Sequence, residues 1–169
     1  MHSRALAAAV LAAALCGCAT VAPPPDRPPV DFTSFDLAAR LSVRQGDRLD
    51  IAKLRWTHSA SADLWVISSP FGSELARIES NGGTVVLTRA GEAPTRAPSF
   101  AALAKSMLGV AIDPEDVARW LHGATAPEAS GWQVEIEERA SDGTVRRLTA
   151  IHAGTVVKLV VDSYRQVPE

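Results

Sequence analysis

The sequence predicts an α+β fold, in which an antiparallel β-sheet carries its helices on one face. Three observations favour this fold. Segments of strand length alternate between apolar and polar residues, two helical patterns are grouped in residues 99–123, and short turns join the strands on either side. Tight turns join antiparallel neighbours, because parallel strands need a long crossover. The chain has 169 residues, 47% of them hydrophobic, which suffices for one domain with one core.

Residues 35–44 form the most regular of the predicted strands. Their apolar and polar side chains alternate strictly, which is typical of a strand with one buried face. Residues 52–56 repeat the pattern, with polar side chains opposite Leu54 and Trp56. Residues 63–68 form a third strand that is apolar on both faces. The buried face of the first strand is predicted to comprise Phe35, Leu37, Ala39, Leu41 and Val43.

The remaining strands lie in two groups, one before and one after the helices. Asn81-Gly82-Gly83 is a strong hairpin signal, and Ser141-Asp142-Gly143 marks a second tight turn. Both turns indicate that the strands around them pair as antiparallel neighbours. The predicted strands are residues 74–79, 84–88, 132–137, 145–151 and 157–164.

Two short helices are predicted between these groups of strands. Ser99 is a suitable cap for a helix over residues 100–108, which carries one apolar stripe. Asp113 caps the second helix, and Pro114 occupies its first turn, where proline is favoured. This second helix ends by Gly123. With the strands on either side, the pair of helices is expected to cover one face of the sheet.

The N-terminus is predicted to be a signal peptide over residues 1–17. Residues 1–4 carry a positive charge, and residues 5–15 contain only Ala, Val and Leu. This apolar run is too short to span a bilayer as a helix. A buried core helix is the alternative, but the proline-rich stretch that follows argues against it.

The segment Leu15-Cys16-Gly17-Cys18 resembles the bacterial lipobox, in which an apolar and a small residue precede a lipidated cysteine. Cys18 fits this pattern and is the predicted lipidation site; an ordinary signal peptide with incidental cysteines is the alternative. Several acyl chains anchor a protein firmly, because each buried CH₂ contributes about 0.8 kcal/mol. No cysteine follows Cys18, so the mature domain has no disulfide to stabilise it.

Residues 18–34 are predicted to be the lipidated cysteine and a proline-rich tether, and residues 35–169 the folded domain. Five of the eleven prolines lie within residues 19–33, a composition typical of an extended spacer. In bacterial lipoproteins an Asp directly after the cysteine is the signal for retention at the inner membrane. Ala19 stands there instead, which favours the periplasmic face of the outer membrane.

Residues that could carry catalysis or hold a metal do not cluster in the sequence. His58, His122 and His152 are scattered, and we interpret them as surface or rim residues. There is no Gly-x-Ser-x-Gly elbow and no cysteine or histidine pattern for zinc. We therefore expect neither an enzyme nor a metal or cofactor site. A net charge of −2 also gives no reason to propose nucleic acid as a partner.

Phe71 lies in a Pro70-Phe71-Gly72 turn, an unusual place for a large aromatic side chain. An exposed phenyl ring is unfavourable in water, so the ring either folds back onto the core or contacts something outside the domain. The second alternative predicts a contact with a membrane or another protein.

An ordered set of segments resembles the LolB family of outer-membrane lipoprotein receptors. It comprises Phe35-x-Leu-x-x-Arg-Leu-x-Val-Arg44, Leu54-x-Trp56, Asp63-x-Trp65, Ser69-Pro-Phe-Gly72, Leu108-Gly109, Trp120-Leu121-x-Gly123, Trp132 and residues 157–164. The resemblance implies an α+β fold with an open antiparallel half-barrel, whose concave apolar face is covered by helices.

The resemblance also implies a transport function. Members of the family take acylated lipoproteins from a periplasmic carrier, LolA, and insert them into the outer membrane. The implied partners are therefore this carrier, the acylated cargo and outer-membrane lipid, and we expect the domain to be a monomer. The family's projecting loop corresponds to Pro70, Phe71 and Gly72. A structural or assembly lipoprotein, or another periplasmic lipid-binding lipoprotein, is the alternative function.

A cavity for acyl chains is expected between the apolar faces of the strands and helices. Sequence alone does not separate residues that line a vacant cavity from residues of a filled core. The predicted lining residues are Leu37, Leu41, Leu54, Trp56, Leu64, Val66, Leu103, Met107, Val117, Trp120, Val134 and Leu159.

Overall fold

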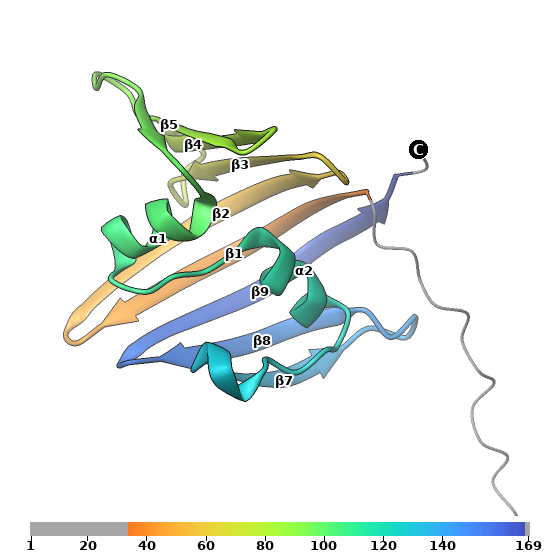
Figure 1. The fold of residues 1–169 in the computed structure, drawn as a ribbon. Coiled ribbons are helices and arrows are strands. Elements are labelled where there is room, and N and C mark those ends of the chain that lie inside the picture. Colours follow the sequence, from red (N-terminus) through yellow and green to blue (C-terminus); the bar gives the residue numbers. More distant parts are fainter. Residues whose placement is uncertain (1–33, 168–169) are drawn as a thin grey trace, which may run out of the picture. The chain divides into compact units, whose positions relative to one another are not determined.

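Nine strands form a single curved antiparallel sheet in the computed structural model, which describes residues 34–167 (Figure 1). Neighbouring strands are antiparallel, and their order across the sheet is β6-β5-β4-β3-β2-β1-β9-β8-β7. The first strand therefore pairs with the last, so β1 lies inside the sheet, between β2 and β9. The strands are β1 (Phe35–Gln45), β2 (Arg48–His58), β3 (Ala62–Ser68), β4 (Glu74–Asn81), β5 (Thr84–Thr88), β6 (Thr95–Ala97), β7 (Gln133–Arg139), β8 (Val145–His152) and β9 (Thr155–Gln166).

The helices lie on one face of this sheet, between β6 and β7 in the chain (Figure 1). In α1 (Phe100–Leu108), the hydroxyl of Ser99 accepts a hydrogen bond from the amide of Ala102 at 3.1 Å. In α2 (Pro114–Leu121), the carboxylate of Asp113 accepts one from the amide of Glu115 at 3.2 Å. Both caps agree with the sequence prediction. A short 3₁₀ helix, η1 (Glu128–Ser130), follows α2.

The predicted α+β architecture is confirmed, and most strand positions agree with the prediction to within a few residues. The largest difference is β2, which begins at Arg48 rather than at residue 52, because it pairs with β1 along its whole length. The short strand β6 and the helix η1 were not predicted. Each contains only three residues, too few for a period to be recognised.

One residue of the predicted tether is described by the structure and packs with the folded domain. Ser34 was assigned to the tether, but it is buried, and its carbonyl accepts a hydrogen bond from the amide of Val167 at 3.0 Å. The predicted signal peptide, Cys18 and residues 19–33 of the tether lie outside the described residues. Within the described part of the chain, no helix is long and apolar enough to cross a membrane.

Candidate functional site: an apolar interior and an exposed aromatic turn

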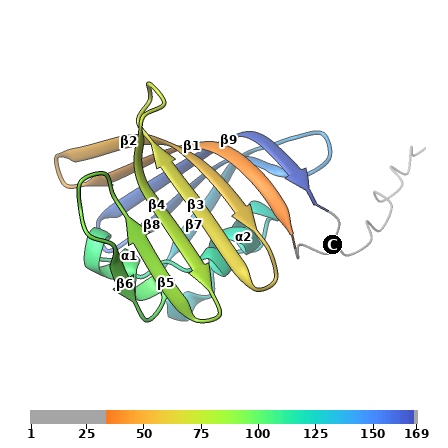
Figure 2. The same ribbon diagram turned by 90° about the horizontal axis from the view of Figure 1, so that it is seen from above.

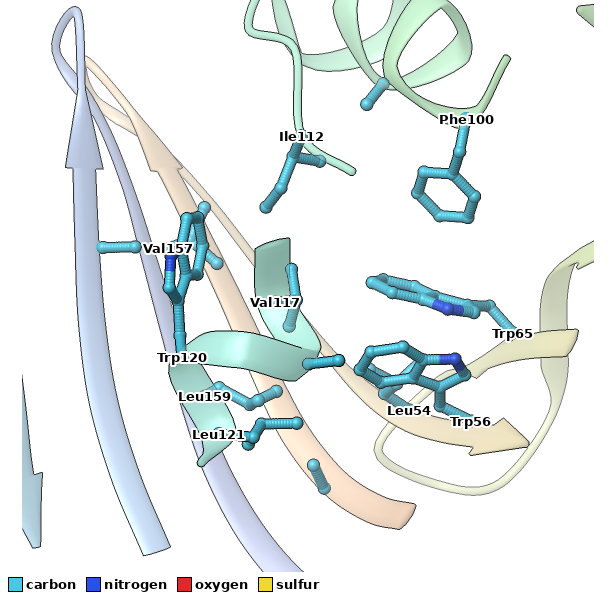
Figure 3. Packing of buried hydrophobic residues seen from close by; sticks show 14 of the residues in the cluster. Leu54, Trp56, Trp65, Phe100, Ile112, Val117, Trp120, Leu121, Val157 and Leu159 are labelled. Atoms are coloured by element: carbon cyan, nitrogen blue, oxygen red, sulfur yellow. The ribbon is translucent and has the colours of Figure 1, made fainter. Parts of the chain in front are cut away.

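The concave face of the sheet and the two helices enclose a continuous cluster of buried apolar side chains (Figure 3). Residues directly opposite each other on paired strands share a face. Leu54 pairs with Ile67 and Trp56 pairs with Trp65, so all four side chains lie on the concave face. From the helices, Phe100, Leu103, Val117 and Trp120 pack against it.

A chain of aromatic rings runs through this interior from β1 to α1. The ring centroids of Phe35 and Trp56 are 4.8 Å apart, and those of Trp56 and Trp65 are 5.0 Å apart. Trp65 in turn lies 4.7 Å from Phe100 on α1, and Figure 3 shows its ring between Trp56 and Phe100. Large aromatic groups dominate the apolar area of a core, so this chain fixes the position of α1 over β2 and β3.

Most of the predicted lining residues belong to this interior. Seven are buried, and Leu41 and Val134 are half-buried against the same cluster. They come from strands on both halves of the sheet and from both helices, so the fold brings together residues that are far apart in sequence. The buried seven are Leu37, Leu54, Trp56, Leu103, Val117, Trp120 and Leu159.

Three predicted lining residues do not belong to the interior. Leu64 pairs with Thr57 and Val66 pairs with Arg55, which places both on the outer, convex face. Trp65 and Ile67 occupy the concave face of β3 instead. Met107 is 39% exposed, because the buried side of α1 consists of Phe100, Leu103 and Ala104. Because β3 is apolar on both faces, its alternation does not distinguish inside from outside.

The prediction that the histidines are surface or rim residues is wrong for His58. Its side chain is only 15% exposed, and its Nδ1 lies 2.7 Å from the carboxylate of Asp63. The same carboxylate oxygen accepts a hydrogen bond from the indole nitrogen of Trp56, also at 2.7 Å. Asp63 thus satisfies two partly buried polar groups at one edge of the aromatic chain.

His122 is also half-buried, at the end of α2. Its Nδ1 lies 2.7 Å from the carbonyl of Ala118, and its Nε2 lies 2.9 Å from the hydroxyl of Tyr164 on β9. Burial raises the pKa of Tyr164 to about 12, so its hydroxyl stays protonated and donates a hydrogen bond to Nε2. Neutral His122, protonated on Nδ1, therefore satisfies both contacts and ties the end of α2 to the sheet.

Acidic pH is expected to weaken this tie. Burial, the largest cause, and the neighbouring His58 hold the pKa of His122 below its ordinary value of 6.5. Below pH 6.5 the unfolded chain binds a proton that the folded chain resists, so this residue's contribution to stability is lost as the pH falls. Urea midpoints measured between pH 8 and pH 5 should decrease less for His122→Gln than for the wild type. Parallel pH profiles would contradict this assignment.

Two buried side-chain nitrogens, Nε1 of Trp65 and Nδ1 of His152, have no hydrogen-bond partner within residues 34–167. The indole nitrogen of Trp65 is enclosed, and no acceptor lies within hydrogen-bond distance of it. By contrast, the indole nitrogen of Trp56 is paired with Asp63, and that of Trp132 donates to the carbonyl of Ala111 at 3.0 Å. An unpaired buried N–H is unfavourable by about 1–3 kcal/mol and calls for an explanation.

The turn between β3 and β4 carries Phe71, which is 98% exposed. Of the two alternatives for this ring, the fold therefore excludes packing against the core. Three hydrogen bonds hold the turn: Gly72 N–H to the carbonyl of Ser69, Ser69 N–H to that of Ser73, and Ser73 N–H to the Ser69 hydroxyl. Gly72 has a φ of 98°, which favours glycine. The turn rises on the side of the sheet opposite the helices (Figure 2).

Neither a metal site nor a second apolar pocket is evident among the described residues. No group of three or more His, Cys, Asp or Glu side chains could hold a metal ion there. A depression of about 360 Å³ borders β1 and β2, but polar side chains dominate its lining, so it does not suit an acyl chain. The depression is lined by Asp36, Leu37, Ala38, Arg55, Trp56, Thr57, Ser163 and Arg165.

Comparisons with known proteins agree with the resemblance seen in the sequence. The family model described as outer membrane lipoprotein LolB matches residues 33–166. An outer-membrane lipoprotein LolB from Thiobacillus denitrificans is 31% identical over 179 residues, which cover 95% of this chain and 96% of the relative. One from Chromobacterium violaceum is 26% identical, covering 92% and 95% of the two chains.

Among solved structures, a LolA superfamily protein from Nitrosomonas europaea is similar with a TM-score of 0.47 and 10% identity, covering 82% of this chain and 89% of that one. The match to the family model spans nearly all the described residues, and one relative exceeds 30% identity over almost the full length. This chain therefore belongs to the LolB family of outer-membrane lipoproteins.

Proposed function

We propose that this protein is a lipoprotein receptor, which accepts acylated lipoproteins from a LolA-type periplasmic carrier and inserts them into the outer membrane. The observation that carries the proposal is Phe71, a fully exposed phenyl ring on a hydrogen-bonded turn. Such a ring gains from leaving water for the boundary between headgroups and acyl chains. The turn is therefore the part of the domain that enters the membrane when cargo is released.

The apolar interior is the proposed binding site for the cargo's acyl chains. Each CH₂ group exposed to water costs about 0.8 kcal/mol, so a released acyl chain would not cross the periplasm free in solution. Transfer requires direct contact with the carrier first and with the membrane afterwards. The enclosed concave face of the sheet offers a continuous apolar surface for these chains.

In the structure, the protein's own side chains fill much of this interior, so acyl chains must displace part of the cover. The helices are suited to this role because α1 has nine residues and α2 has eight. Helices of this length are marginal on their own and depend on packing against the sheet. We propose that α1 and α2 shift outward as acyl chains replace their apolar contacts with the concave face.

The unpaired indole nitrogen of Trp65 supports this assignment. A lipoprotein's acyl chains are linked through ester or amide groups, whose carbonyl oxygens are hydrogen-bond acceptors. A carbonyl placed beside Trp65 would satisfy this donor, which has no partner among the described residues. This contact would position the polar end of an acyl chain without holding the chain so strongly that it cannot leave.

The proposed lipid anchor on Cys18 keeps the receptor at the membrane that it serves. Fifteen residues lie between Cys18 and Ser34, and a fully extended chain over this distance spans at most about 58 Å. This reach allows an anchored domain to meet a soluble carrier and still bring Phe71 to the membrane. The proposed activity is binding and transfer, without catalysis or a cofactor, by a monomeric domain.

A transfer experiment tests the proposal. A LolA-type carrier loaded with a fluorescent acylated lipoprotein is mixed with the mature chain carrying Cys18→Ala, and the two complexes are separated. We expect the fluorescence to move to this chain, because its interior offers the acyl chains a second apolar site. The same cargo without acyl chains is the control and should not move. A folded chain that takes no acylated cargo from the carrier would contradict the receptor function.

A further inference from the structure

The outer face of three neighbouring strands, β2, β1 and β9, carries an arrangement that the apolar interior does not explain. We call the nine outward-facing positions of β2, β1 and β9 nearest the β1–β2 hairpin the outer patch. Strand pairing aligns them in three rows: Leu49 with Arg44 and Val156, Ile51 with Ser42 and Lys158, and Lys53 with Arg40 and Val160. Their inward-facing neighbours on β1 and β9, such as Val43 and Leu159, are buried on the concave face.

The charges of the outer patch have one sign. Four of its nine positions are cations and none is acidic. Arg40 is paired with Asp162 at 3.0 Å. Arg44, Lys53 and Lys158 are exposed and form no salt bridge within residues 34–167. A protein with a net charge of −2 therefore presents a local group of uncompensated positive charges on the outer face of these strands.

Between these cations lie apolar side chains that are open to water. Leu49 is 51% exposed and Ile51 is 56% exposed, and they follow each other along the outer face of β2. Val156 and Val160 on β9 are half-buried. A solvated sheet face ordinarily carries polar residues at these positions. Apolar side chains interspersed with cations are instead typical of surfaces that lie in the membrane interface.

The outer patch is continuous with the turn that carries Phe71. Ser68, the last residue of β3, pairs with Lys53 of the patch, so the β3–β4 turn starts directly beside it. Leu75, on the other side of the turn, is 49% exposed. The turn rises on the side of the sheet away from α1 and α2, which is also the side of the outer patch (Figure 2).

We propose that the outer patch is a membrane-docking surface that selects anionic phospholipid. Its cations bind lipid phosphates, and each cation contributes binding free energy that grows with the negative surface potential of the membrane. Leu49 and Ile51 enter the membrane interface. The domain then lies with its convex face on the membrane, Phe71 inserted and the helices facing the periplasm. This inference rests on the proposed function only because it assigns Phe71 to the membrane. The outer patch combines positive charges with exposed apolar side chains, and this combination favours a lipid surface over an acidic protein as its partner.

The test compares two double charge reversals in the mature chain carrying Cys18→Ala. Arg44→Glu with Lys158→Glu alters the outer patch; Arg96→Glu with Lys105→Glu changes the net charge equally on exposed residues of β6 and α1. Binding is measured to phosphatidylcholine vesicles with and without phosphatidylglycerol. We expect the wild type and the control to prefer anionic vesicles, with binding that weakens as salt is raised. The patch variant should lose about tenfold or more of its affinity for them.

Three results would overturn the inference. In the first, the wild type binds neutral and anionic vesicles equally well. In the second, the patch variant and the control lose the same affinity for anionic vesicles. In the third, the patch variant binds these vesicles as tightly as the wild type does. Cargo acceptance from the carrier, measured without vesicles, separates this inference from the proposed function. If the wild type accepts no cargo, the receptor function fails; if only the patch variant fails to accept cargo, the patch contacts the carrier protein and not lipid. Equal urea midpoints show that the variants are folded.

Discussion

Phe71→Glu is expected to impair delivery of cargo to liposomes strongly while leaving acceptance from the carrier unchanged. The ring is 98% exposed, so its replacement removes almost no packing within the domain. A carboxylate at the same position must leave water to enter the interface, which opposes insertion of the turn. We expect delivery to decrease by at least about tenfold, since the change both removes an apolar group and adds a charge. Release of a fluorescent lipoprotein into liposomes measures this step.

Two matched variants make this prediction specific. Phe71→Leu keeps an apolar side chain on the same turn and should retain most of the delivery. Leu75→Glu places the same charge on a neighbouring side chain that is 49% exposed, and should have a smaller effect. The urea midpoints of all three should be close to that of the wild type, because the turn's hydrogen bonds involve Ser69, Gly72 and Ser73. Unchanged delivery by Phe71→Glu would show that the turn does not enter the membrane.

Much of the fold could be predicted because several independent signals agreed. In the first strand, alternation identified Leu37 and Ala39 as buried, and the structure confirms both. Ser99 and Asp113 marked the starts of the helices because their side chains can accept hydrogen bonds from free amide groups. These signals are local, and a local pattern predicts the structure correctly when the tertiary contacts favour the same conformation.

The candidate site could be predicted only in part, because its residues are defined by contacts between distant segments. Trp65 was missed as an interior residue because both faces of β3 are apolar, and only its pairing with Trp56 assigns the face. The burial of His58 was missed because its partner, Asp63, lies across a hairpin. Ile112, buried in the connection between α1 and α2, belongs to no periodic segment. None of these features leaves a pattern in a single strand or helix.

The outer patch could not be predicted from the sequence either. Arg44, Lys53 and Lys158 each occupy the polar face of a predicted strand, where a charged residue is unremarkable on its own. Only the pairing of β2 with β1 and of β1 with β9 brings them next to one another and to Ile51. Function on a sheet therefore depends on register as much as on composition. A shift of one residue in the pairing of β2 with β1 would turn Lys53 toward the apolar interior and away from Arg44 and Lys158.

Asp63→Ala is expected to be among the most destabilising single changes in the domain. One oxygen of this carboxylate accepts from the indole nitrogen of Trp56 and contacts Nδ1 of His58, both at 2.7 Å. Trp56 is 1% exposed, so its N–H would lose its only protein acceptor among the described residues and gain no water. A buried N–H left without an acceptor typically costs about 1–3 kcal/mol, and the contact with His58 is lost as well. This loss is a sizeable part of the roughly 5–15 kcal/mol that stabilises a typical domain.

Asp162→Ala is the matched control, because it removes the same side chain from an exposed salt bridge with Arg40. Its side chain is 47% exposed, and such pairs contribute about 0–1 kcal/mol. Asp63→Asn keeps an oxygen that can accept from Trp56 and should therefore recover part of the loss. Urea unfolding, followed by tryptophan fluorescence and circular dichroism, measures all three. If Asp63→Ala costs no more than Asp162→Ala, the contacts of Asp63 do not stabilise the aromatic chain. The position of α1 over the sheet must then depend on the apolar packing of Trp65 against Phe100 alone.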